Sequence, residues 1–106
     1  MKIIQDKRNK LEIKAAQLIA VKIREYAKTQ DKVVLGIPGG RSVLGIFQLL
    51  KNQSLPWHKV HIFMIDERLV PIDHPDSNFG LADKQFIYYL IKNNILPRKN
   101  IHPYIY

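Results

Sequence analysis

Four adjacent residues of this sequence could hold an anion. Gly39, Gly40, Arg41 and Ser42 follow a short apolar run, and paired glycines let backbone N–H groups face a ligand without interference from Cβ atoms. Arg41 adds a fork-shaped cation and Ser42 adds a hydroxyl donor, a combination that suits phosphate. The same glycines would also serve a tight turn between a strand and a helix, so the pattern alone leaves both interpretations open.

A second group of charged residues, Asp66-Glu67-Arg68, comes directly after the apolar run Val60–Ile65. Ligands of open α/β sheets bind beyond the carboxyl ends of the strands. If Val33–Ile37 and Val60–Ile65 are neighbouring parallel strands, both charged segments face one crevice. The alternative is a strand end that reaches water with its charges paired to each other.

Two well-known phosphate loops do not fit the first segment. Gly36 and Gly40 enclose three residues and Arg41 follows, whereas the P-loop encloses four and continues with Lys and Ser or Thr. The dinucleotide fingerprint G-x-G-x-x-G is also missing. A nucleotide site is therefore not expected.

Hydrophobic periodicity predicts the elements that position these segments. Apolar residues four apart predict a packing helix from about Arg8 to Lys28, and β-branched or continuous apolar runs predict the strands. Ser42 is the expected N-cap of the helix that follows the glycines. The sequence thus predicts an α/β fold with helices at about Arg8–Lys28, Val43–Leu50 and from Phe79 past Leu90 to Asn93-Asn94, and strands at Val33–Ile37, Val60–Ile65 and Ile101–Tyr106.

Length and composition narrow the class of protein. The chain has 106 residues, 46% of them hydrophobic, no cysteine and a net charge of +8, which favours one small cytoplasmic domain, or a piece of a larger one, and predicts no membrane span. The basic residues lie mostly along the first helix with few aromatics among them, so nucleic-acid binding is not expected. Four scattered histidines without helical pairing do not predict a metal site.

The order and spacing of several segments carry a resemblance. Gly39–Ser42, Trp57, Asp66–Pro71 and His74–Asn78 resemble the 6-phosphogluconolactonases, which share a superfamily with glucosamine-6-phosphate isomerase/deaminase. The isomerases usually carry Tyr at the positions of Arg68 and Asn78, so the chain is similar to the lactonase branch.

The resemblance implies a hydrolase that converts 6-phosphoglucono-1,5-lactone to 6-phosphogluconate in the pentose phosphate pathway, with no required cofactor. It implies a Rossmann-like three-layer fold with a parallel sheet between helical layers, here incomplete. By the same resemblance, Gly39, Gly40, Arg41 and Ser42 would bind the substrate phosphate. Asp66 and Arg68 would be the catalytic residues at the lactone end, and Ser77 and Asn78 would brace the loop.

One departure from the family matters. Its members are about twice as long, and the histidine thought to activate water lies in a Gly-rich Asp-Gly-His segment that this chain lacks. Residues 1–106 are therefore expected to be the N-terminal part of a single domain and to be inactive alone. Two alternatives remain, a sugar-phosphate isomerase or deaminase with Asp66 as proton shuttle, and a non-catalytic sugar-phosphate-binding domain. The sequence does not predict an oligomeric state.

Overall fold

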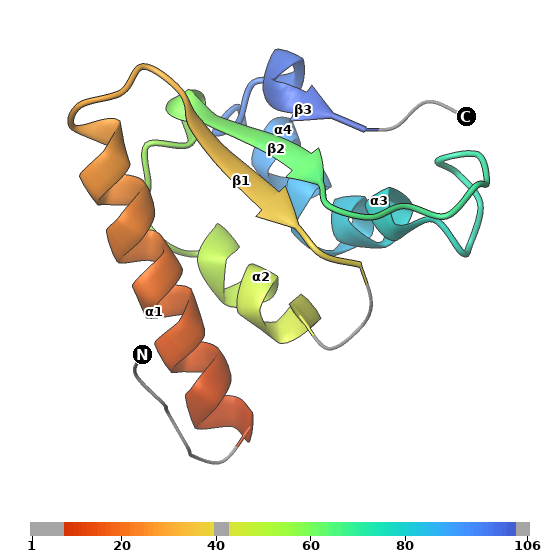
Figure 1. The fold of residues 1–106 in the computed structure, drawn as a ribbon, viewed down its shortest axis with the longest axis horizontal. Coiled ribbons are helices and arrows are strands. Elements are labelled where there is room, and N and C mark those ends of the chain that lie inside the picture. Colours follow the sequence, from red (N-terminus) through yellow and green to blue (C-terminus); the bar gives the residue numbers. More distant parts are fainter. Residues whose placement is uncertain (1–7, 40–42, 104–106) are drawn as a thin grey trace.

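The computed structural model of the chain describes residues 8–39 and 43–103 (Figure 1). Short 3-10 turns, Trp57–Lys59 and Arg98–Asn100, precede two of the strands, and a π-helical turn, Asp83–Ile87, joins two helices. The helices and strands are α1 (Arg8–Ala27), β1 (Val33–Ile37), α2 (Leu44–Lys51), β2 (Val60–Met64), α3 (Asn78–Ala82), α4 (Tyr88–Lys92) and β3 (Ile101–His102).

The strands form a parallel sheet in the order β1-β2-β3. Val33 pairs with Val60 and Ile37 with Met64, and Phe63 pairs with His102 on the other side of β2. The three arrows in Figure 1 accordingly point the same way. The hypothesis that Val33–Ile37 and Val60–Ile65 are neighbouring parallel strands is confirmed, and Gly39 and Asp66 follow these strands at the same edge of the sheet.

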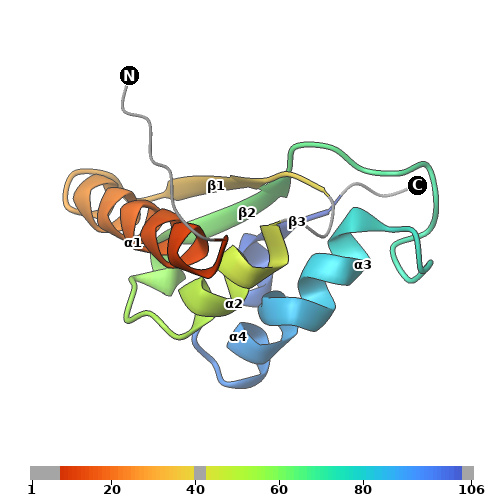
Figure 2. The same cartoon turned by 90° about the horizontal axis from the view of Figure 1, so that it is seen from below.

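One face of the sheet is covered by helices. In Figure 2, α2, α3 and α4 lie on one side of the sheet, and α1 runs beside α2. Strand residues alternate between the two faces, so every second residue joins the core under these helices. The buried core includes Ile37, Phe47, Leu50, Trp57, Val60, Ile62, Met64, Phe86, Ile87 and Leu90, and the rings of Phe47 and Phe86 stack at 5.1 Å.

No helix of the described residues covers the opposite face of the sheet, which is called the open face below (Figure 2). Val34 is 67% exposed there, Phe63 is 40% exposed, and Ile65 just past β2 is 65% exposed. Parallel strands usually bury both faces, and their sequences are correspondingly apolar throughout. The α/β class is confirmed, while the described residues supply a helical layer to one face of the sheet.

Two histidines meet on the open face. Nδ1 of His61 lies 2.9 Å from Nε2 of His102, and the His102 ring stacks on Phe63 with centroids 4.3 Å apart. Burial, followed by the positive charges of His102, Lys32 and Lys99, lowers the pKa of His61. Within the described ranges, no three His, Cys, Asp or Glu side chains group so that they could hold a metal ion.

The buried stripe of α1 differs in part from the one that residues four apart predict, which is Leu11, Ala15, Ile19, Ile23 and Ala27 with Leu18 and Tyr26 beside them. Ala16, Ala20, Ile23 and Ala27 are buried, whereas Leu18 and Tyr26 are about half exposed. Steps of four drift about 40° per step around a helix with 3.6 residues per turn, so residues spaced by alternating steps of four and three stay closer to one face of the helix.

Across residues 8–39 and 43–103, no helix combines the length and apolarity needed to cross a membrane.

The one-sided cover predicts a large difference between two isoleucines near the end of β2. Ile62 is 1% exposed under the helices, and Ile65 is 65% exposed on the open side. Ile62→Ala should lower the free energy of unfolding by about 2–5 kcal/mol, because it leaves a cavity. Ile65→Ala should change it by about 0.5 kcal/mol or less. Urea unfolding followed by circular dichroism measures both, and similar losses would contradict the assignment of an open face.

Candidate active site

The carboxyl ends of β1 and β2 lie side by side. The N–H of Ile65 donates to the carbonyl of Ile37 at 2.9 Å, which extends the pairing one residue past β2. Gly39 and Asp66 each follow their strand by two residues. The two segments that carry candidate chemistry therefore leave the sheet at the same edge, as the crevice hypothesis requires.

Asn78 joins these two segments. Its side-chain Nδ2 donates to the carbonyl of Asp66 at 3.2 Å, and the same amide packs so closely on Gly39 that a Cβ there would overlap it. Glycine is thus needed at position 39 for close approach. The first residue of α3 thereby links the start of the glycine turn to the end of β2.

The carboxylate of Glu67 ties the end of β2 to the first turn of α3. Oε1 accepts from the backbone N–H of Arg68 at 2.8 Å and from that of Asn78 at 2.6 Å. Oε2 accepts from the N–H of Phe79 at 2.9 Å and from the Ser77 hydroxyl at 3.0 Å. The first N–H groups of a helix have no partner within the helix, and here a carboxylate from another segment supplies two of them with acceptors.

These hydrogen bonds shift the titration of Glu67. Burial is the largest single influence and acts to raise its pKa, but the hydrogen bonds from Phe79, Arg68, Asn78 and Ser77 together outweigh burial. The pKa of Glu67 is consequently below its ordinary value of 4.5. The group is an ionised structural acceptor at neutral pH.

Ser77 caps α3 and is 2% exposed. Its hydroxyl donates to Glu67 and accepts from the N–H of Gly80 at 3.0 Å, which satisfies another helix-end donor. The last residue of the loop thus caps the helix that follows it. The contacts of Ser77 and Asn78 suit the bracing role that the resemblance implies, and that role stays a prediction.

Of the remaining predicted site residues, the structure describes only some. The side chains of Asp66 and Arg68 are exposed at the sheet edge, where they could face a ligand. Gly40, Arg41 and Ser42 lie outside the described residues. Helix α2 begins at Leu44 with Val43 in the N-cap position and no side-chain cap, so the prediction that Ser42 is the N-cap of this helix is wrong.

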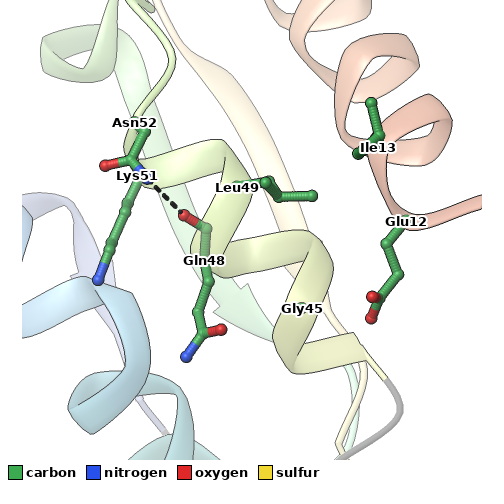
Figure 3. A pocket seen from close by; sticks show the side chains of 7 residues that line it. All are labelled: Glu12, Ile13, Gly45, Gln48, Leu49, Lys51 and Asn52. Atoms are coloured by element: carbon green, nitrogen blue, oxygen red, sulfur yellow. Dashed lines mark hydrogen bonds between the residues drawn. The ribbon is translucent and has the colours of Figure 1, made fainter. Parts of the chain in front are cut away.

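A separate groove lies between α1 and α2 (Figure 3). It has a volume of about 460 Å³ and is lined by Glu12 and Ile13 from α1 and by residues at and just after α2, among them Gln48 and Lys51. The Asn52 amide donates to the Gln48 carbonyl at 3.3 Å. None of the predicted site residues lines this groove, so the candidate site is the edge where β1 and β2 end.

Comparison with known proteins identifies the family of the chain. The family model described as glucosamine-6-phosphate isomerases/6-phosphogluconolactonase matches residues 6–106. The chain belongs to this family.

Curated members of the family show the same similarity. A 6-phosphogluconolactonase of Neisseria meningitidis is 45% identical over 78 residues, which are 74% of this chain and 32% of that protein. One of Thermotoga maritima is 32% identical over 84 residues, 79% of this chain and 36% of that protein. The chain thus spans about a third of the length of these relatives.

A solved structure confirms the fold. The crystal structure of a Thermotoga maritima 6-phosphogluconolactonase matches with a TM-score of 0.81 and 26% identity over 96% of this chain and 44% of that chain. The sheet order and helix placement described above thus occur in a family member of more than twice the matched length.

Glu67 is the residue whose part in the site the sequence did not reveal. It stands inside the charged segment that the sequence singled out, and its neighbours Asp66 and Arg68 received the chemical roles. The sequence signal that points to Glu67 is a carboxylate upstream of a Ser-Asn pair that starts a helix, because negative charge is stabilising near a helix N-terminus. Nothing in the spacing says that a residue ten positions upstream reaches this helix.

The lowered pKa of Glu67 predicts a specific acid sensitivity. A carboxylate with a depressed folded-state pKa contributes stability that is complete above its unfolded-state value, 4.5, and is lost as the pH falls through the folded-state value. Glu67→Gln removes this titration, so its free energy of unfolding should fall less steeply below about pH 4.5. Urea unfolding at a series of pH values measures the slope. Equal acid sensitivity of wild type and variant would contradict the hydrogen-bonding pattern.

Proposed function

We propose that this chain forms the sugar-phosphate-binding part of a 6-phosphogluconolactonase, a hydrolase that opens 6-phosphoglucono-1,5-lactone to 6-phosphogluconate. The observation that carries the proposal is the junction of Gly39, Asn78 and Asp66, which brings the glycine turn and the charged strand end to one edge of the sheet. The names of the relatives support the choice of reaction. A cytoplasmic location stays a prediction.

In this proposal the two segments divide the ligand between them. The turn at Gly39 and Gly40, with Arg41 and Ser42, binds the phosphate, since backbone N–H groups and a guanidinium suit that anion. Hydrolysis of the lactone develops negative charge on the carbonyl oxygen, and the exposed Arg68 cation can stabilise it. Asp66 lines the same end, and binding at both ends orients the lactone for attack by water.

A second candidate function follows from the family description, which names glucosamine-6-phosphate isomerases as well. An isomerase would need Asp66 to move a proton between adjacent carbons of the sugar. Arg68 and Asn78 favour the lactonase, because the isomerases usually carry Tyr at both positions. A non-catalytic sugar-phosphate-binding domain would use the same phosphate turn without the chemistry.

The proposal predicts a selective effect of Arg41 on ligand affinity. Wild-type chain should bind 6-phosphogluconate in titration calorimetry, and Arg41→Ala should weaken binding about tenfold or more, since a charge-assisted hydrogen bond is worth roughly 1.5–3 kcal/mol. Arg98→Ala is the matched control, because Arg98 precedes β3 and so lies at the opposite, amino end of the sheet. An unchanged affinity in Arg41→Ala would show that Arg41 does not bind the phosphate.

Activity assays separate the candidate functions. The chain alone is expected to hydrolyse the lactone no faster than the spontaneous reaction, because the proposed residues include no histidine to act as base for water. A coupled assay with a relative of full length as positive control measures this rate. Release of ammonia from glucosamine 6-phosphate would instead support the isomerase or deaminase.

A further inference from the structure

We infer that Glu67 is a positioning residue whose carboxylate fixes the separation between the glycine turn and the Asp66–Arg68 segment, so that one ligand can reach both. This inference rests on the proposed function and deepens it, since the resemblance gave Glu67 no role. Glu67 acts in this role through its hydrogen bonds to Arg68, Ser77, Asn78 and Phe79.

The contacts of Glu67 are arranged for such a role. Each carboxylate oxygen accepts two hydrogen bonds, between 2.6 and 3.0 Å long. One donor, the N–H of Arg68, belongs to the lactone-end segment itself, and the other three belong to Ser77, Asn78 and Phe79. Hydrogen bonds to an ionised acceptor are short and strong, so this carboxylate holds the two segments in one arrangement.

The arrangement extends from Glu67 to the glycine turn through Asn78. Glu67 holds the Asn78 backbone, while the Asn78 side chain donates to the carbonyl of Asp66 and packs on Gly39. Ser77, which is 2% exposed, stabilises the same start of α3, because its hydroxyl accepts a hydrogen bond from the N–H of Gly80. A shift of α3 relative to β2 would therefore change the distance from Gly39 to Asp66.

Ligands of different length report on that distance. 6-Phosphogluconate carries a phosphate at one end and a carboxylate at the other, so its affinity depends on the separation of the two segments. Inorganic phosphate occupies only the turn and is insensitive to the separation. A residue that serves only the stability of the fold would leave the ratio of these two affinities unchanged.

The variant Glu67→Gln tests the inference with little change in shape. One of the two oxygens becomes an NH₂ group, so two of the four donors lose their acceptor or face another donor. The matched control is Asp73→Asn, which removes the same charge from an exposed residue of the loop between β2 and α3. This control corrects for any general effect of charge on anion binding.

Titration calorimetry at neutral pH should show a distinct pattern. Glu67→Gln should weaken binding of 6-phosphogluconate by about tenfold or more, because misplaced binding groups lose much of their joint effect. Its affinity for inorganic phosphate should stay within about twofold of wild type, as should the affinities of Asp73→Asn for both ligands.

Amide hydrogen exchange gives a readout that does not depend on a ligand. In Glu67→Gln, the N–H groups of Asn78 and Phe79 should exchange faster while that of Ile62 keeps its protection.

A second variant covers the case in which Glu67→Gln does not fold. Asn78→Ala keeps the backbone N–H that Glu67 accepts but removes the side chain between Gly39 and Asp66. It should produce the same selective loss for 6-phosphogluconate.

The outcomes separate this inference from the proposed function. If wild type binds 6-phosphogluconate no more tightly than phosphate, the proposed function is wrong, and the positioning role is wrong with it. If wild type discriminates between the ligands but Glu67→Gln and Asn78→Ala keep the wild-type ratio, only the positioning role is overturned. Unchanged exchange of Asn78 and Phe79 in Glu67→Gln would also overturn it.

Discussion

The carboxylate of Glu67 is the contact on which the candidate site depends. A buried strand that ends in charged residues and a short helix with unpaired N–H groups each have a polar end that must be satisfied. Glu67 satisfies both by accepting from its own segment and from α3. Without such an acceptor, the loop between β2 and α3 would have no fixed return to the sheet, and Asn78 would not be held against Gly39.

The parallel sheet explains why the site lies where it does. Neighbouring parallel strands end at the same edge, and the next residues of both chains must leave the sheet there. In β1 the exit uses Pro38 and Gly39, which stop the strand and admit another side chain at close range. In β2 the exit uses charged residues. Gly39 and the charged end of β2 are therefore neighbours in space although 26 residues lie between Gly39 and Asp66 in the chain.

The uneven cover of the sheet gives its two faces different physical roles. The helix-covered face contains the large apolar side chains and supplies the stability of the chain through the hydrophobic effect. The open face combines exposed apolar residues with the His61–His102 pair, in which burial and nearby positive charge lower the pKa of His61. A solved family member with a similar fold is more than twice as long as the part that this chain matches.

The sequence by itself determined the local features of this protein. Apolar periodicity predicted the helices and strands, and the breaker Pro38-Gly39 predicted the end of β1, because these features depend on residues close together in the chain. The spacing of two separated segments also indicated the family to which the chain belongs. Tertiary structure decided the rest: which face of α1 is buried, that His61 meets His102, and that Glu67 rather than its charged neighbours accepts the donors of α3. Those contacts join residues 10 to 41 positions apart, and periodicity carries no information about such distances because it reports only how each segment divides itself between core and solvent.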